Sequence, residues 1–284
     1  TFGFPLDLTQ DYLRSKDIDV DVESFDASMK LQKEEARSSW KGSGDGNTEK
    51  LWFDIARKTK PTVFKGYDET TLKANVTALV LDSEVVDELS DKIKKSAIIT
   101  DESCFYAESG GQVGDKGIIS SENGEFRVTD TRKTPQGIFI HFGNVISGNF
   151  KIGHEVKLKV DTSLRDLIKK NHSATHLLHA ALRNNLGPHV AQRGSLVNEN
   201  KLRFDFSHNK QISSNQIDTI QKEVTNIISN TCETQIDIKS QEEAIKLGAM
   251  ALFGEKYGEE VRVVTLGEDT VSYTHLTLPT MLWV

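Results

Sequence analysis

The sequence predicts an α+β protein built from a helical N-terminal segment, a small antiparallel β-barrel and an α+β domain. Its 284 residues correspond to about two domains at roughly 150 residues each. The 27% charged and 37% hydrophobic residues are typical of a chain that folds. Short β-rich runs fill the chain between Thr62 and Asp161, whereas helical periodicity returns from Ser163 onward.

The first sixty residues are expected to combine helices with a linker. Apolar residues recur every three to four positions from Leu6 to Arg37, and the stretch from Val20 to Glu23 opens the second helix. Three glycines among small polar residues between Ser38 and Asn47 indicate a flexible linker. Because the chain begins with Thr1 rather than methionine, we expect it to be part of a longer protein.

The middle region is expected to form a small barrel or sandwich of antiparallel strands. Val156, Leu158 and Val160 alternate with lysines, which is the period-two pattern of a half-buried strand. Glycines separate this run from the others, as turns do in small all-β folds. The predicted strands are 76–81, 97–100, 117–119, 126–131, 138–142 and 156–160.

The last region mixes helices with strands. A long helix is predicted over 163–185, and Gly187-Pro188 ends it. Ser213 and Ser214 are possible caps of a later helix. The other predicted elements are a hairpin (194–197 and 202–206), helices at 214–230 and 241–247, and strands at 235–238 and 261–266.

Composition excludes several classes of protein. No apolar run approaches the ~18–20 residues of a membrane-spanning helix, and the first residues lack a signal-peptide pattern. Cys104 and Cys232 are too few for a disulfide framework, and they lack the spacing of a cysteine zinc knuckle. We therefore expect a cytoplasmic protein with no membrane partner. The net charge of −7 argues weakly against a nucleic-acid partner.

Two histidines on the predicted 163–185 helix are candidate metal ligands. With Leu178 at 0°, His172 and His176 fall at about 120° and 160°, beside the apolar stripe. Such an i, i+4 pair either presents two imidazoles to one Zn²⁺ ion or forms a polar helix edge. The glutamate of a zincin protease is missing. His179 is either a donor behind the ligands or a boundary histidine. The expected core face is Leu164, Leu167, Ala174, Leu178, Ala181 and Leu182.

Several motifs, in one order, closely resemble the editing region of alanyl-tRNA synthetases. The opening segment from Phe2 to Thr9 is similar to the end of that family's tRNA-recognition region, so the resemblance covers residues 1 to about 272. Several motifs in one order are far more specific than any single one. The motifs that carry the resemblance are HSATHLLHAAL from His172, ESGGQVGD from Glu108, GSLV from Gly194, RFDFSH from Arg203 and GAMALFGEKYG from Gly248.

The resemblance implies an enzyme, a proofreading hydrolase for seryl- and glycyl-tRNA(Ala). A synthetase pocket distinguishes alanine from these amino acids by only ~1–3 kcal/mol, so a second site removes the errors. The implied partner is tRNA(Ala), chiefly its aminoacylated 3′ end, and not DNA. The aminoacylation core of the alanine-tRNA ligase, which uses ATP and Mg²⁺, would precede Thr1, so we do not expect this chain to activate alanine.

The resemblance also implies a division of the chain. Residues 1–60 would be the end of the helical tRNA-recognition region and a linker, and 61–161 a β-barrel subdomain. Residues 162–272 would be the α+β editing (deacylase) domain, with the HxxxH helix packed on a sheet. Residues 273–284 would be an anomalous tail.

Individual residues acquire roles from the same resemblance. His172 and His176 correspond to two of four Zn²⁺ ligands, and the ion would orient the aminoacyl end or polarise water. Gln112 corresponds to the residue that faces the editing pocket, where an amide can position the ester or the attacking water. Gly110 and Gly111 shape its loop and are assigned to substrate binding.

Two of these assignments have simpler alternatives. The Gly110-Gly111-Gln112 segment is otherwise a glycine turn with an exposed polar residue. Arg203, on a strand near the pocket, is expected to contact the tRNA 3′ end, and it is otherwise an ordinary surface arginine.

The sequence departs from the family pattern after Leu266. The pattern continues to Glu-Leu-Cys-Gly-Gly-Thr-His, whereas this chain has no cysteine there. The missing ligands would fall near Leu276 and Thr280, and His275 is out of step. We hypothesise that residues from about Tyr273 onward are foreign. With two of four ligands present, we predict weak metal binding and impaired editing.

Two other functions stay open. A free-standing trans-editing deacylase shares the main motifs, although residues 1–37 count against it. A tRNA-binding module without catalysis is compatible with the missing ligands.

The acidic total hides a basic region. Residues 157–210 contain ten Lys or Arg and four Asp or Glu, a net charge of +6, which leaves −13 for the rest of the chain. This segment includes the histidine helix and the strands that follow it. We therefore expect the salt-sensitive phosphate contacts of a tRNA to be concentrated here.

Overall fold

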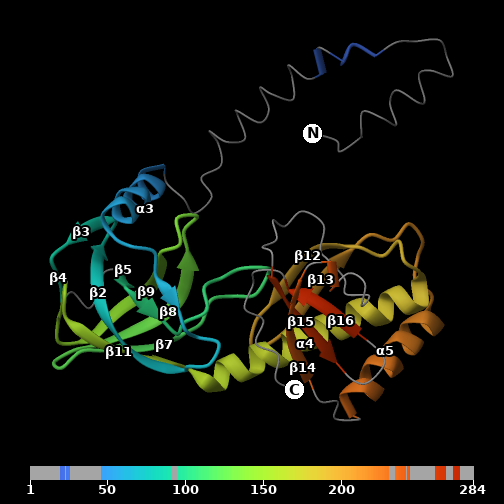
Figure 1. Cartoon of the computed structure of the whole chain (residues 1–284). Coiled ribbons are helices and arrows are strands. Elements are labelled where there is room, and N and C mark those ends of the chain that lie inside the picture. Colours follow the sequence, from blue (N-terminus) through green and yellow to red (C-terminus); the bar gives the residue numbers. More distant parts are fainter. Residues whose placement is uncertain are drawn as a thin grey trace. The chain divides into compact units, whose positions relative to one another are not determined.

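The computed structural model of the chain describes residues 20–22, 24–25, 46–90, 95–229, 234–240, 242–243, 260–266 and 271–275. It consists of two compact units, Thr1–Lys50 and Leu51–Val284. Figure 1 shows the elements of both units.

In the first unit, Asp21 begins a helix. Its carboxylate accepts hydrogen bonds from the Ser24 backbone N–H at 2.9 Å and from the Ser24 hydroxyl at 2.7 Å, as an N-cap does. The predicted opening of a helix between Val20 and Glu23 is confirmed. The rest of the helices predicted over 6–37, and residues 38–45 of the predicted linker, lie outside the described residues.

The linker prediction is wrong at its end. Helix α3 (Gly46–Lys58) begins inside the predicted linker. Beyond the glycines, Leu51, Trp52 and Ile55 recur at helical spacing, and Ile55 is buried against Ala97 and Ile99 of the barrel's outer side. The helix forms because its apolar face finds a partner, which outweighs the loop preference of Gly46 and Asn47.

The predicted barrel is confirmed. Its strands run antiparallel in the order β11-β7-β8-β9-β5-β2-β3, and β11 also pairs with β2, which closes the ring. All six predicted strands are present, some of them longer than predicted. They are β2 (Thr71–Leu81), β5 (Ser96–Thr100), β7 (Gly117–Ser120), β8 (Glu125–Lys133), β9 (Phe139–Ser147) and β11 (Glu155–Val160). The seventh strand, β3 (Glu84–Val86), was not predicted.

Four two-residue strands accompany the barrel and were not predicted, because two residues carry no period. They are β1 (Val63–Phe64), β4 (Glu88–Leu89), β6 (Glu102–Ser103) and β10 (Phe150–Lys151), paired as β1 with β6 and β4 with β10. Inside the barrel, Phe105, Phe126 and Phe150 are fully buried among aliphatic side chains. The alternation of buried and exposed residues along β11 follows the predicted period of two.

His141 is a fully buried polar side chain of the barrel. The Ile98 carbonyl can only accept, so His141 Nδ1 donates to it at 2.9 Å, and Nε2 accepts from the Ser103 hydroxyl at 2.8 Å. The Ser103 oxygen in turn accepts from the Phe105 N–H at 3.0 Å. Burial lowers the pKa of His141 to about 4, so the ring is neutral at pH 7.

The predicted long helix is confirmed as α4 (Thr162–Leu186). Asp161 caps its start by accepting from the Leu164 N–H at 3.2 Å. Gly187, with φ +115°, follows its end. The predicted hairpin is confirmed as β12 (Gln192–Val197) and β13 (Leu202–Phe206), and both strands contact α4.

Helix α5 (Ser214–Ser229) also packs on α4. Of the two possible caps, Ser213 is the one used: its hydroxyl accepts from the Gln216 N–H at 3.3 Å. Ala181, Leu182, Val190 and Ile220 are the buried centre of this packing. A helix packed on a hairpin thus follows the barrel, as the predicted α+β class requires.

A second antiparallel sheet contains β14 (Thr234–Ser240), β15 (Glu260–Leu266) and β16 (Val271–His275) in that order. The first two strands were predicted. β16 includes the first residues of the segment expected to be foreign, whose origin stays a prediction. Residues 276–284, the 248–258 motif and most of the predicted 241–247 helix lie outside the described residues. Within the described residues, no helix has the length and apolar character needed to cross a membrane.

Candidate functional site

The buried side of α4 carries its histidines. His172, His176 and His179 are only 8%, 7% and 4% exposed. Leu167, predicted to lie in the core, is 46% exposed, whereas Ala181 and Leu182 are buried as predicted. The prediction failed at Leu167 because the 106–115 loop of the barrel and the β12–β13 hairpin pack on the polar side of α4. The leucine pattern of one helix does not reveal such contacts.

Gln112 and His172 are in direct contact. The Gln112 Oε1 and His172 Nδ1 atoms are 2.6 Å apart. An amide oxygen only accepts, so Nδ1 carries the proton and Nε2 keeps its lone pair. Gln112 is 9% exposed, so the alternative of an exposed turn residue is wrong. Burial lowers the pKa of His172 to about 4, and the ring is therefore neutral at pH 7.

His176 and His179 extend the cluster along the helix. The rings of His172 and His176 lie with centroids 4.9 Å apart. The His179 ring lies 5.0 Å from Phe204 of β13, and burial, followed by the charge of Arg183, lowers the pKa of His179. His179 is therefore a buried member of the helix–hairpin interface.

The glycine loop is shaped to fit against β12. Gly110 and Gly111 have φ of +59° and +84°, in the left-handed region that favours glycine. A Cβ on Gly111 would overlap the Ser195 carbonyl. The Val197 N–H donates to the Gly111 oxygen at 2.7 Å. The two glycines thus let the backbone approach the hairpin and direct Gln112 toward α4.

A buried ion pair joins α4 to the same loop. Arg165 and Asp115 have side chains that are 3% and 2% exposed and are in contact. Sequence reasoning missed both residues. A signal was present, because Arg165 precedes His172 by seven residues and so lies on the same side of the helix. Asp115 is the last residue of the motif that contains Gln112.

The structure does not bring Arg203 into this cluster. Its side chain is 68% exposed, and its Nε and Nη2 atoms donate to Asp205 on the same strand at 3.0 and 2.6 Å. This ion pair raises the pKa of Arg203 and lowers that of Asp205. Arg203 is a surface residue of the hairpin.

The described residues do not make a complete zinc site. A structural site needs four ligands and a catalytic site three protein ligands. Among the described residues, no group of three or more His, Cys, Asp or Glu side chains is arranged to hold a metal. His172 and His176 lie side by side, and Cys104 is buried in the barrel core, where burial raises its pKa to about 12. The segment that would supply the other two ligands has no described side chains.

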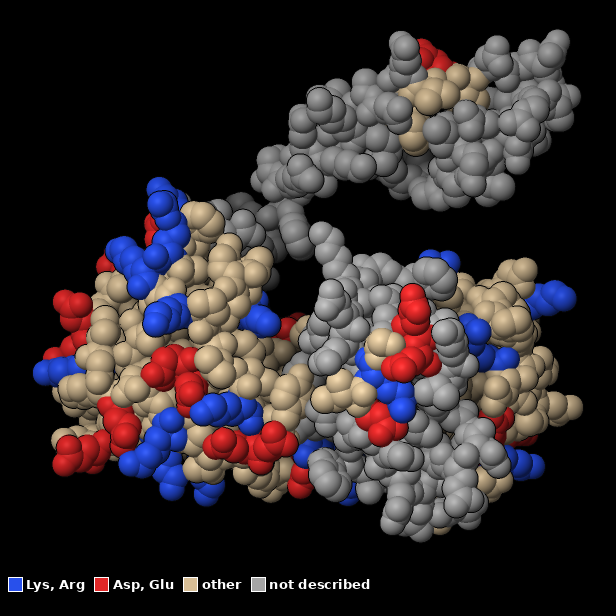
Figure 2. All heavy atoms as spheres, in the orientation of Figure 1, with Lys and Arg blue, Asp and Glu red and all other residues tan. Residues whose placement is uncertain are grey.

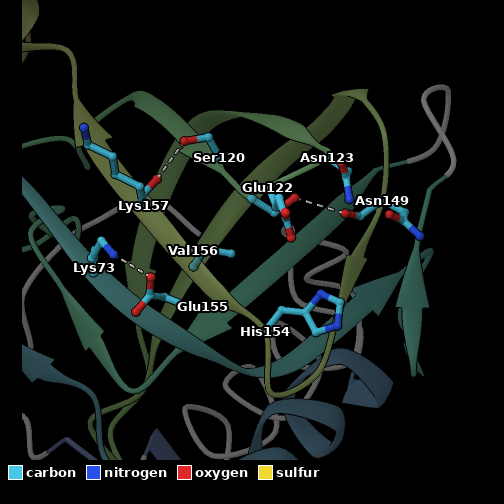
Figure 3. Close-up of a pocket in the computed structure, with 10 residues that line it drawn as sticks. Lys73, Ser120, Glu122, Asn123, Asn149, His154, Glu155, Val156 and Lys157 are labelled. Atoms are coloured by element: carbon cyan, nitrogen blue, oxygen red, sulfur yellow. Dashed lines mark hydrogen bonds and ion pairs between the residues drawn. The ribbon is translucent and has the colours of Figure 1, made fainter.

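A hollow of about 670 Å³ lies on the barrel (Figure 3). Its lining includes Lys73, His154, Glu155 and Lys157. Lys73 Nζ donates to Glu155 at 2.7 Å, so that lysine's charge is balanced within the hollow. None of the candidate site residues Gly110, Gly111, Gln112, His172, His176 and Arg203 lines this hollow, and the Gln112–His172 contact is the better candidate site.

The comparisons with known proteins agree with the motifs. The family model "tRNA synthetases class II (A)" matches residues 1–164. The chain is 48% identical to the alanine–tRNA ligases of Rhizobium johnstonii and Parvibaculum lavamentivorans over 270 residues each, which are 94% and 95% of this chain. It spans 30% of the length of these relatives. The chain therefore belongs to the alanyl type of the class II tRNA synthetase family.

Proposed function

We propose that this chain is the proofreading region of an alanine–tRNA ligase and hydrolyses seryl- and glycyl-tRNA(Ala). The observation that carries the proposal is the buried contact between Gln112 and His172. It joins a glycine loop and a histidine helix that the sequence assigned to the same site. In this proposal the protein acts in the cytoplasm, and ATP and Mg²⁺ serve a separate aminoacylation core of the full-length ligase.

The contact orients the Gln112 amide. Because its oxygen accepts the His172 proton, its NH₂ group is directed away from the ring. That group can donate to the carbonyl oxygen of an aminoacyl ester, where negative charge develops as water attacks the carbonyl carbon. The bond from that carbon to the ribose oxygen then breaks, and the ribose oxygen takes up the proton that the attacking water gives up. Serine or glycine and free tRNA are released.

His172 acts through its fixed tautomer. The Nδ1–H holds the amide, and the Nε2 lone pair can accept a hydrogen bond from the attacking water. Because the ring is neutral at pH 7, it does not repel a cationic α-amino group of the substrate. The chain itself thus supplies a donor for the carbonyl oxygen and an acceptor for the water.

The charge distribution supports docking of the tRNA on this side of the chain. Over the barrel, basic and acidic side chains are interspersed in the view of Figure 2. The segment 157–210 has a net charge of +6, and Lys170, Arg193 and Lys201 in it are exposed. Phosphate contacts here would position the 3′ end and weaken as salt rises.

Deacylation of seryl-tRNA(Ala) by the full chain tests the proposal. We expect Gln112→Ala to lower kcat by about 100-fold, the typical effect of losing one donor to a developing oxyanion. Gln136→Ala, in an exposed turn of the barrel, is the matched control and should leave kcat unchanged. If the wild-type chain binds tRNA(Ala) but does not deacylate seryl-tRNA(Ala), the alternative of a tRNA-binding module without catalysis is correct instead.

Metal analysis tests the ligand set separately. Because the described side chains supply two histidines and no group of three or more possible ligands, we expect purified protein to hold much less than one equivalent of Zn²⁺. Stoichiometric Zn²⁺ that survives dialysis, and that is lost in His176→Ala, would show that residues outside the described side chains complete the site.

A further inference from the structure

We infer that Arg165 and Asp115 are positioning residues that hold Gln112 against His172. The inference rests on the proposed hydrolysis. Its starting observation is that the 106–115 loop is joined to α4 at two places on one helix face: Gln112 on His172 and Asp115 on Arg165. Seven residues, or about two turns, separate the two attachment points on the helix.

Arg165 uses its guanidinium to connect three parts of the chain. Nε donates to both Asp115 oxygens, at 3.3 and 3.1 Å. Nη1 donates to the Gly66 carbonyl at 3.2 Å, and Nη2 donates to the Cys104 carbonyl at 2.6 Å and also to Asp115. The rigid, planar fork of arginine sets the distance of α4 from both the loop and the barrel wall, which a lysine cannot reproduce.

Asp115 passes this constraint to the loop. Its carboxylate accepts from the Tyr106 N–H at 2.6 Å, and its own N–H donates to the Tyr106 carbonyl at 2.9 Å. The Thr131 hydroxyl donates to the Asp115 carbonyl at 2.9 Å. The two ends of the loop are therefore tied to each other and to β8, and Gln112 lies between them with little freedom to shift.

Stability alone does not explain a buried ion pair at this place. Two charges lose their hydration on burial, and apolar side chains of similar volume often stabilise a fold equally well. An apolar pair, however, makes no directional hydrogen bonds that would fix the position of the loop. A hydrogen bond of 2.6 Å between Gln112 and His172 requires accurate placement, and a displacement of about 1 Å at a reacting group can reduce a rate by about 100-fold.

The test separates folding from placement. Arg165→Met alone leaves Asp115 charged and buried, whereas the double variant Arg165→Met/Asp115→Asn removes both charges. We expect the double variant to fold and to hydrolyse seryl-tRNA(Ala) with kcat lowered by about 10- to 100-fold and KM within about twofold. Arg165→Lys should recover part of kcat. A folded double variant with the wild-type kcat would overturn the inference.

Two controls match these variants. Lys73→Met removes an exposed lysine that pairs with Glu155 on the barrel surface, and it should leave kcat unchanged. Phe126→Leu weakens the barrel core, where Phe126 packs against Phe150. If Phe126→Leu lowers kcat as much as the double variant at the same stability, the ion pair is only structural. Should the double variant fail to fold, Arg165→Lys decides, and an unchanged kcat in it is again the overturning result.

A second readout keeps this inference apart from the proposed function. The side-chain amide NMR signal of Gln112, assigned by its loss in Gln112→Ala, should shift and broaden in the double variant. If the wild-type chain hydrolyses nothing but this signal moves, the proposed function fails and the positioning role stands. If the wild-type chain is active and neither the signal nor kcat changes in the double variant, the positioning role fails and the proposed function stands.

Discussion

The interior of the barrel and the buried face of α4 remove different side chains from water. The barrel encloses Phe105, Phe126 and Phe150 with aliphatic neighbours. The corresponding face of α4 presents an arginine and three histidines. Apolar burial is favourable in almost any arrangement that fills the space, whereas buried polar groups are tolerated only with matched partners.

This difference separates two tasks. The barrel can vary in sequence and still hold its shape, because closure by backbone hydrogen bonds leaves its interior to be filled by volume. The α4 interface depends on named pairs, Gln112 with His172 and Asp115 with Arg165. We therefore expect substitutions in the barrel to change stability in proportion to volume, and substitutions at α4 to affect activity beyond their effect on stability.

The largest effect on stability should come from Arg165→Met. It leaves the Asp115 carboxylate buried without its cation, which costs about 3–5 kcal/mol of unfolding free energy. Urea unfolding measures this. Arg132→Met, which removes an exposed arginine paired with Asp130, is the counterpart and should cost about 0.5 kcal/mol or less. A loss below about 1 kcal/mol for Arg165→Met would mean that the α4 interface does not depend on its matched pairs and tolerates substitution as the barrel does.

Acid should lower the free energy of unfolding through His141, a fully buried polar side chain of the barrel. His141 has a folded pKa of about 4, below the ordinary value of about 6.5, so unfolded chains bind more protons between these values. Its contribution is complete above about pH 6.5 and is lost as the pH falls toward 4, by about 3 kcal/mol. Unfolding free energies at pH 7, 6, 5 and 4 should therefore decline less steeply in His141→Gln. Parallel curves for the two proteins would contradict this.

A smaller change in stability, with a large change in activity, is expected at Gln112. Gln112→Ala removes the acceptor of the His172 Nδ1–H and should cost about 1–2 kcal/mol. Ile119→Val in the barrel core should cost about 1 kcal/mol and serve as its match. The two variants should have similar free energies of unfolding, whereas kcat for deacylation should be about 100-fold lower in Gln112→Ala than in Ile119→Val. Equal rates would remove the distinction between the two regions.

The smallest effect belongs to the barrel surface. Lys73 and Glu155 form an ion pair at 2.7 Å with side chains 71% and 62% exposed. Solvent screens such pairs, so Lys73→Ala should change the unfolding free energy by about 0.5 kcal/mol or less, and added salt should narrow the difference further. A loss comparable to that of Arg165→Met would mean that exposure does not separate the two kinds of ion pair.

Local patterns predicted most elements because their causes are local. The period of two placed β11 to within one residue, and Gly187 marked the end of α4. Strand β9 extends to Ser147, beyond the predicted end at 142. The prediction ended too early because glycine is typical of turns. Gly143 instead lies inside the strand, where a side chain would overlap the Arg127 carbonyl.

The candidate site was predicted in its parts. The motifs identified Gln112 and His172, but their contact joins residues 60 positions apart in the chain. Arg203 was expected near them and instead pairs with Asp205 on its own strand, because a strand pattern does not say which side chain a neighbour will engage. No pattern within one element carries that information.

The sequence by itself determined six strands of the barrel, the helix α4 with the glycine that ends it, and the family, because each is written in patterns within short segments. Only the tertiary structure decided which face of α4 is buried. That choice depends on the barrel loop and the hairpin, which approach the helix from distant parts of the chain. Their polar groups make the histidine side favourable to bury, which a count of leucines along one helix does not register.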